Sequence, residues 1–204
     1  MADDYKDMIR GMMGKKRYIH SCNVAEMCVK LAEIHGGDVK KAYLAGILHD
    51  CRKEAEAEVQ RKEMLASGYY VDPAELASKS TWHGIAAAYY LREELGITDK
   101  DVLDSVRYHT VAHAAMTKLE KIVYLGDLVS AERDFPDVEK YRAYALKDLD
   151  DGMYKALKWS VMNLSANDKK IPVCTIEAFN YYMDKADIQS EKKGKKKQGE
   201  KNDR

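Results

Sequence analysis

Apolar residues recur along this chain mainly at three- and four-residue spacing, and no segment shows the apolar–polar alternation of a half-buried strand. This pattern predicts an all-α fold, a bundle of about eight to ten helices. The expected helices cover residues 4–13, 17–35, 38–51, 54–66, 80–95, 98–110, 117–130, 138–146, 149–164 and 175–183, with a further start signal at 72–75.

Capping signals mark several of these boundaries. Gly36-Gly37 is a typical helix end, and Asp72-Pro73 combines an N-cap with a proline at the first helical position. Thr98-x-x-Asp101 and Thr117-x-x-Glu120 both resemble capping boxes. Each helix therefore has local signals of its own as well as an apolar face.

The chain has 204 residues, 46% of them hydrophobic, which is enough for one substantial core. We expect a single domain over residues 1–188. Residues 189–204 contain no apolar side chain and are expected to be a disordered tail, since they cannot offset the entropy of folding by burial.

The net charge of the whole chain favours no class of partner, because Lys plus Arg and Asp plus Glu are both 34. The balance conceals a net charge of plus four on residues 191–204 and minus four on the rest. Nucleic acid is therefore not the expected partner. The tail is expected to be solubilising, with weak electrostatic contact to RNA or ribosomes as the alternative.

The N-terminus lacks the basic-then-apolar order of a signal peptide, and no apolar run is long enough to span a bilayer. Cys22, Cys28, Cys51 and Cys174 form no Cys-x-x-Cys pair. Reduced thiols in a cytoplasmic protein, without a membrane partner, are the expectation from both observations.

Candidate chemistry begins at His49-Asp50, where the apolar run Ala45–Leu48 ends in an imidazole and a carboxylate. Such a pair suits a borderline divalent metal, although the dipeptide alone is weak evidence. Asp127 interrupts another apolar helix, and burying its charge unpaired would cost several kcal/mol. Further imidazoles lie on or at the ends of other predicted helices; the complete candidate set is His20, His49, Asp50, His83, His109 and Asp127.

A lone histidine on an apolar face, such as His20, is more often a satisfied core residue than a ligand. The whole set is more specific than any member. If four imidazoles and two carboxylates converge, the natural arrangement is two ions bridged by Asp50, with open positions for water and a substrate oxygen.

The order His, His-Asp, His, His, Asp on successive helices resembles the HD-domain superfamily of metal-dependent phosphohydrolases, in its variant with a dinuclear centre. The sequence also contains the blocks Ala45–Lys53, Tyr108–Thr110, Leu119–Asp127, Arg133–Pro136 and Thr175–Tyr182. These blocks resemble the bacterial YqeK family over about residues 5–185. That family hydrolyses symmetrical dinucleoside tetraphosphates such as Ap4A to two ADP.

The resemblance implies two divalent metal ions, with iron expected and manganese, cobalt or zinc as alternatives. Asp50 would orient the attacking water, and Lys53 would reach a phosphate oxygen or the leaving group. Thr110 and Arg133 would contact substrate, Arg133 at a distal phosphate. One metal would be held by His20, His49, Asp50 and Asp127, and the other by Asp50, His83 and His109.

One departure concerns substrate binding. The family often carries Thr-Gly-Arg after the His-Thr pair, whereas this chain has Val111-Ala112-His113. His113 would replace the missing phosphate-binding arginine, add a metal ligand or face solvent. The sequence does not identify the residues that bind the base, because 14 tyrosines and two tryptophans offer too many aromatic candidates.

Three other functions are compatible with the same residues. Another HD nucleotide phosphohydrolase, such as a nucleotidase or a (p)ppGpp hydrolase, would share the His-Asp core. A dinuclear iron oxygenase can use the same ligands, and a nucleotide sensor would bind without turnover.

Overall fold

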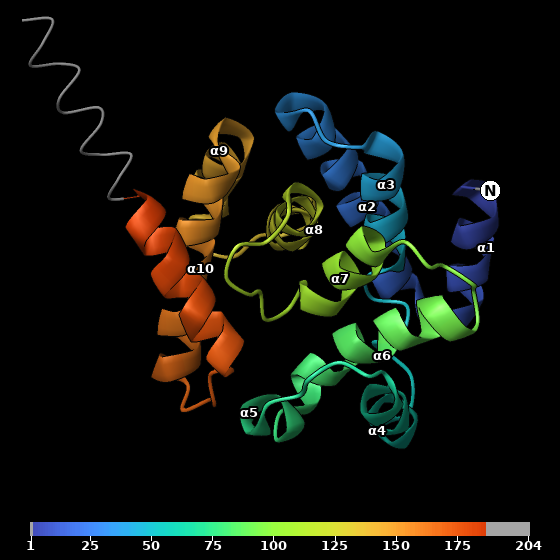
Figure 1. The fold of residues 1–204 in the computed structure, drawn as a ribbon. Helices are drawn as coiled ribbons and strands as arrows, with labels where there is room; N and C mark the ends of the chain where they lie inside the picture. Colours follow the sequence, from blue (N-terminus) through green and yellow to red (C-terminus); the bar gives the residue numbers. More distant parts are fainter. Residues whose placement is uncertain (1, 187–204) are drawn as a thin grey trace, which may run out of the picture.

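In the computed structural model, which describes residues 2–186, every regular element is a helix, which confirms the all-α prediction (Figure 1). The helices are α1 (Ala2–Met12), α2 (Lys15–His35), α3 (Val39–Leu48), α4 (Ala57–Ala66), α5 (Pro73–Leu76), α6 (Lys79–Glu93), α7 (Lys100–Tyr108), α8 (Lys118–Val129), α9 (Val138–Lys147), α10 (Leu149–Ala166) and an unlabelled one at 173–186. The predicted tail, 189–204, lies outside the described residues.

Local capping explains where the helices begin. The box at Thr117 and Glu120 forms as predicted, with Glu120 N donating to Thr117 Oγ1 at 3.2 Å. The box predicted at Thr98 is wrong. The N-cap is Asp99, whose carboxylate accepts from the amides of Asp101 and Val102 at 3.1 and 3.3 Å, because an ionised oxygen is the better acceptor for these unpaired donors.

Helix α8 lies between the α2–α3 pair on one side and α9 and α10 on the other (Figure 1). Two glycines allow the closest approaches. A Cβ on Gly46 of α3 would lie 2.8 Å from the Ala25 Cα of α2, and one on Gly126 of α8 would lie 2.5 Å from Cys28 Sγ. These contacts bring three helices together beside the predicted metal ligands.

A buried ion pair fixes α5 against α7. Arg107 Nη2 donates to Glu75 Oε2 at 3.0 Å, and Arg107 Nη1 lies 2.8 Å from Glu75 Oε1, too far off line to count as a second hydrogen bond. Asp72 caps α5 and also accepts from Val173 N at 3.0 Å. The helix at 173–186 is thereby tied to α5.

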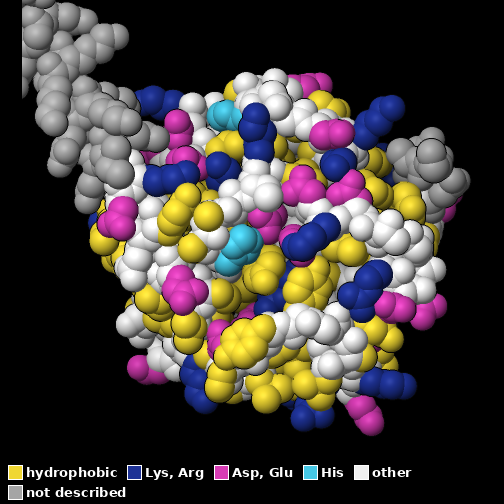
Figure 2. Space-filling view, viewed as in Figure 1, with side chains coloured by type: hydrophobic (Ala, Val, Ile, Leu, Met, Phe, Trp, Pro, Cys, Tyr) yellow, Lys and Arg dark blue, Asp and Glu magenta, His cyan; other side chains and the backbone are white. Residues whose placement is uncertain are grey.

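Lys and Arg side chains are interspersed with Asp and Glu over the face shown in Figure 2. No helix within residues 2–186 is long and apolar enough to cross a membrane. The four cysteines are free.

Candidate metal centre

All six predicted metal ligands meet at one point in the core. His20 comes from α2, His83 from α6 and Asp127 from α8, while His109 follows the end of α7. His49 and Asp50 were expected inside the third helix, but α3 ends at Leu48 and both lie in the turn that follows. Of the six, all except Asp127 are nearly inaccessible to solvent; the Asp127 side chain is 21% exposed.

Asp50 stands between two pairs of imidazoles. Its Oδ2 lies 3.6 Å from His20 Nε2 and 3.5 Å from His49 Nε2, and its Oδ1 lies 3.1 Å from His83 Nε2 and 3.6 Å from His109 Nε2. Asp127 Oδ1 adds a second carboxylate 3.1 Å from His20 Nε2. Each oxygen of Asp50 therefore faces a different pair of nitrogen donors.

The backbone fixes the orientation of two of these rings. His49 Nδ1 lies 2.7 Å from Gly46 O, and His109 Nδ1 lies 2.6 Å from Val106 O. A carbonyl oxygen only accepts, so both Nδ1 atoms carry a hydrogen and donate it. The Nε2 lone pairs of His49 and His109 are consequently left facing Asp50, as metal-ligating imidazoles require.

Burial keeps much of this cluster in the protonation state that binds metal. It lowers the pKa of His49 and of His83 to about 4, so both rings are neutral at pH 7. Burial opposes ionisation of Asp50, but the surrounding imidazoles outweigh it and hold the pKa of this carboxyl well below its usual range. His20 differs, because Asp127 and Glu132 outweigh burial and raise its pKa.

These donors fit divalent cations. His20, His49 and Asp50 offer ligand atoms within 4.8 Å of one another, and so do Asp50, His83 and His109. His83 Nε2 and His109 Nε2 are only 3.1 Å apart. Neutral imidazole with carboxylate is the donor chemistry of zinc, iron, manganese and related ions, and Asp50 is common to both groups.

Comparison with known proteins agrees with this geometry. The model of the HD domain family matches residues 17–132, which is more than half of the chain. The chain belongs to the HD domain family.

Within the HD domain family, the chain is similar to proteins named symmetrical bis(5'-nucleosyl)-tetraphosphatase. The one from Bacillus subtilis is 33% identical over 177 residues, covering 86% of this chain and 94% of the relative. The one from Staphylococcus aureus is 34% identical over 183 residues, covering 87% and 92%. The chain thus belongs with the YqeK-like tetraphosphatases, as its sequence predicts.

A crystal structure from Clostridium acetobutylicum has the same fold. It is described as that of a predicted HD superfamily hydrolase involved in NAD metabolism. It superposes with a TM-score of 0.86 at 30% sequence identity, covering 91% of this chain and 98% of that one.

Three cations lie around the HD centre. Lys53 Nζ lies 3.2 Å from each ring nitrogen of His83, and Arg133 Nη2 lies 2.5 Å from Asp127 Oδ1. The third, Arg17, donates from Nη1 to Asp50 Oδ2 at 2.6 Å. Arg17 was not among the predicted site residues, although its position three residues before His20 places it on the same side of α2.

Glu132 is a second residue at the centre that the sequence pattern does not indicate. Its Oε1 pairs with His20 Nδ1 and accepts from Ser130 Oγ at 2.7 Å, while Oε2 accepts from Asn23 Nδ2 at 2.7 Å. This carboxylate orients the His20 ring from outside the centre. It follows the end of α8, where no periodic signal indicates its direction.

A cleft of about 470 Å³ opens from the centre, lined by Lys53, His109, Thr110, Asp127 and Arg133 among others. Three of the four predicted substrate-binding residues are thus in this cleft. Thr110 Oγ1 is buried there without a hydrogen-bond partner in the described part of the chain.

His113, the fourth, has a different environment. Its Nε2 lies 2.7 Å from Glu120 Oε1, its Nδ1 lies 2.7 Å from Ala114 O, and its ring meets the Tyr108 ring at a centroid distance of 4.4 Å. It does not line the cleft. The pairing with Glu120 supports a structural role for His113 outside the proposed site.

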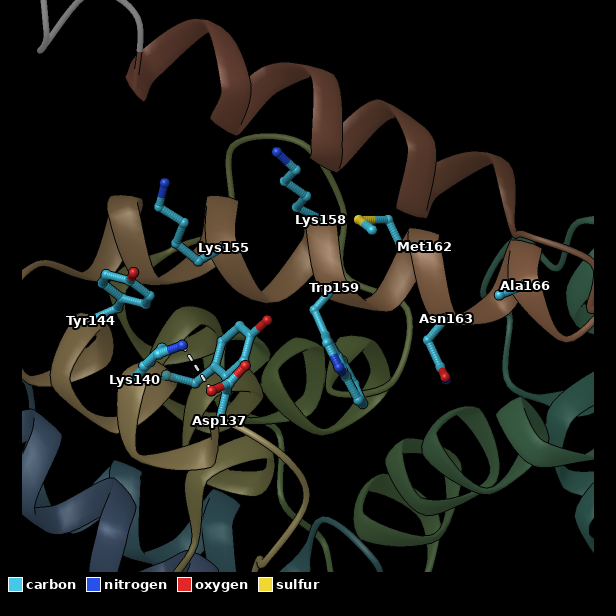
Figure 3. Close-up of a pocket in the computed structure, with 10 residues that line it drawn as sticks. Asp137, Lys140, Tyr144, Lys155, Lys158, Trp159, Met162, Asn163 and Ala166 are labelled. Carbon is cyan, nitrogen blue, oxygen red and sulfur yellow. Dashed lines mark ion pairs between the residues drawn. The ribbon is translucent and has the colours of Figure 1, made fainter.

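A further cleft lies between α9 and α10 (Figure 3). Lys155 and Lys158 point to the other side of α10 from Trp159, and Lys140 is paired with Asp137 at 2.8 Å. The basic and aromatic side chains that line this cleft therefore do not converge on one point. Trp159 also lines the cleft at the centre and therefore forms part of the wall between the two.

Proposed function

We propose that this HD protein is a metal-dependent phosphohydrolase that converts Ap4A and water to two ADP. The placement of Asp50 between two imidazole pairs carries the proposal, since it is the arrangement that a dinuclear centre needs. The names of the tetraphosphatase relatives support the substrate.

The metal ligands of this proposal are His20, His49, Asp50, His83, His109 and Asp127. Two divalent ions bound there would neutralise phosphoryl oxygens and lower the pKa of the attacking water. Iron is the metal we propose, with manganese, cobalt or zinc as the alternatives.

The protein's own cations hold the tetraphosphate, which is strongly anionic. Lys53, beside His83, and Arg133, beside Asp127, both line the cleft and bind phosphate oxygens there. Burial, together with Arg17 and Arg133 nearby, lowers the pKa of Lys53 in spite of Asp50. Its ammonium group donates a hydrogen bond to the oxygen that leaves.

Cleavage is an in-line displacement at the central anhydride. The oxygen of water, oriented by Asp50, bonds to one β-phosphorus while the bond from that phosphorus to the central bridging oxygen breaks. The bridging oxygen departs on the second ADP, and the water proton is released to solvent.

A cytoplasmic location belongs to the same proposal, supported by four free cysteines, which a reducing compartment keeps as thiols.

The test is metal analysis of freshly purified protein followed by chromatography of its Ap4A products. Two metals per chain with ADP as the sole product are expected. AMP plus ATP would contradict the cleavage position. Bound metal without any hydrolysis would favour the oxygenase or the sensor, and a panel of other nucleotides distinguishes the remaining HD hydrolases.

A further inference from the structure

Two clefts of similar size meet at the metal centre but differ in chemistry. The first, which we call the aromatic cleft, has about 470 Å³, and its apolar lining is Val111, Tyr124, Leu128, Phe135, Trp159, Leu164 and Pro172. The second, which we call the charged cleft, has about 430 Å³ and is lined by Lys16, Arg17, Glu54, Glu132, Arg133 and Asp134, with His20 and Phe135.

Arg133 and Phe135 line both clefts. His109 and Asp127 belong to the aromatic cleft and His20 to the charged cleft, and His20 Nε2 lies 3.1 Å from Asp127 Oδ1. A tetraphosphate with its central anhydride at the centre would therefore send one half into each cleft.

The aromatic cleft suits a nucleoside. Phe135 and Trp159 stack with ring centroids 5.0 Å apart and an interplanar angle of 28°, which makes one apolar wall. A purine base packs on such a surface through its π face. Ser160, also in the lining, offers a hydroxyl group for a polar edge of the nucleoside, whereas the Thr175 hydroxyl already donates to Val111 O at 2.6 Å.

The charged cleft suits phosphate but not a base. Three of its side chains are cations and three are carboxylates. Phe135 is the only aromatic side chain among its described lining residues, and that ring already stacks on Trp159. Lys16 can bind phosphate oxygens, and so can the donors of Arg17 other than Nη1, which already bonds Asp50. A base in this cleft would have no second apolar surface.

We propose that the enzyme recognises only one of the two nucleosides of its symmetrical substrate, through Trp159 and Phe135, and binds the other half by its phosphates alone. This inference rests on the proposed function. It predicts a further substrate class, nucleoside 5'-tetraphosphates, which present one nucleoside and four phosphates.

For adenosine 5'-tetraphosphate the reaction balances as it does for Ap4A. The water oxygen bonds to the β-phosphorus, the bond from that phosphorus to the oxygen bridging to the γ-phosphorus breaks, and that oxygen departs on pyrophosphate. The products are ADP and pyrophosphate, with one proton released. The nucleoside in the aromatic cleft sets this position, two phosphates from the ribose.

The experiment compares kcat/KM for Ap4A and adenosine 5'-tetraphosphate on the same metal-loaded enzyme. We expect the two values to agree within about tenfold, with ADP and pyrophosphate as products. Normal Ap4A hydrolysis with adenosine 5'-tetraphosphate more than about 100-fold slower, or cut to ATP and phosphate, overturns the inference. Failure on Ap4A itself would instead contradict the proposed function.

Trp159→Ala is the matched variant, with Lys158→Ala on the exposed side of α10 as its control. Trp159→Ala should lower kcat/KM at least about tenfold for both substrates and leave their ratio unchanged, whereas Lys158→Ala should change neither. Because the ratio comes from one sample, partial unfolding does not affect it. A ratio that changes more than about tenfold with Trp159→Ala contradicts the proposal.

Binding gives a readout independent of turnover. ADP is titrated into the protein while tryptophan fluorescence is followed; Trp82 is buried, with Nε1 donating to Glu75 O at 3.0 Å, so Trp159 is the reporter. One ADP per chain should change the signal, and Trp159→Phe should abolish the change. A second equivalent ADP site, or a change that survives Trp159→Phe, overturns the inference.

Discussion

Asp50 is the residue on which the metal centre depends, because its two oxygens face different imidazole pairs. Asp50→Ala should remove both metals and lower Ap4A hydrolysis by at least about a thousandfold, while His83→Ala should remove mainly one metal. Metal content, product chromatography and circular dichroism are the measurements.

The control for these variants is His35→Ala, since His35 lies outside the cluster and bonds to Ala145 O at 2.8 Å. It should keep two metals per chain. If Asp50→Ala also retained both metals with an unchanged helical spectrum, the bridging position of Asp50 would be wrong.

His113 and Glu120 form a pair whose contribution depends on pH. Burial opposes the charge on each, but their mutual hydrogen bond outweighs it, so that the pKa of His113 is raised and the pKa of Glu120 is lowered. The His113 contribution is complete below its ordinary pKa of 6.5 and is lost as the pH rises through the raised value. The Glu120 contribution is lost as the pH falls below 4.5.

His113→Ala should therefore reduce the free energy of unfolding more at pH 5.5 than at pH 8.5, with a difference of about 1 kcal/mol between the two values. Urea unfolding at both pH values measures it. Glu120→Gln should abolish this pH dependence, because it removes the charge and keeps an oxygen in the capping box. An equal loss at both pH values would show that the pair carries no such linkage.

At the scale of elements, the approach of α8 to α2 sets the position of Asp127, the residue next to Gly126. Gly126→Ala should destabilise the fold by about 2 kcal/mol, since its Cβ would lie 2.5 Å from Cys28 Sγ. Removing that sulfur should relieve the clash, because the next contact, Cys28 N, lies at 3.6 Å.

The double variant Gly126→Ala with Cys28→Ala tests this packing. In a double-mutant cycle measured by thermal or urea unfolding, it should be more stable than the sum of the single changes predicts. Additive losses would mean that the sulfur is not what limits the approach of the two helices.

Helix periodicity predicted the elements well and their ends less well. The apolar spacing predicted the correct helices, but it does not choose between Thr98 and Asp99, two neighbouring residues that can both cap a helix. His49 and Asp50 look like the end of a helix in sequence, although they lie in the turn after it. The exit from the helix is what lets both side chains of this adjacent pair face one centre.

The candidate site was predictable where side chains are chemically unusual for their surroundings. Imidazoles and carboxylates in apolar helices stand out, and all six converge. Arg17 and Glu132 look like ordinary charged residues, and only the fold brings them to Asp50 and His20. The two clefts were not predictable, because each is lined by residues from distant segments.

On the scale of the whole molecule, the centre connects helices that are far apart in sequence. The six proposed ligands come from α2, α6 and α8 and from the turns after α3 and α7, so metal bound there would join five segments of the fold. Ions that bind only the folded state stabilise it by mass action, by about 4 kcal/mol at a thousand times the dissociation constant.

Chelation of the metal should therefore lower the melting temperature of the intact protein by about 10 °C, because a domain of this size shifts by roughly 2–4 °C per kcal/mol. Calorimetry of the loaded and chelated protein measures the shift, and restored metal should reverse it. Asp50→Ala, which lacks the bridge, should melt at the same temperature with and without chelator. Equal melting temperatures for loaded and chelated wild-type protein would mean that the six side chains hold their positions without help from metal, and that the ions serve the reaction alone.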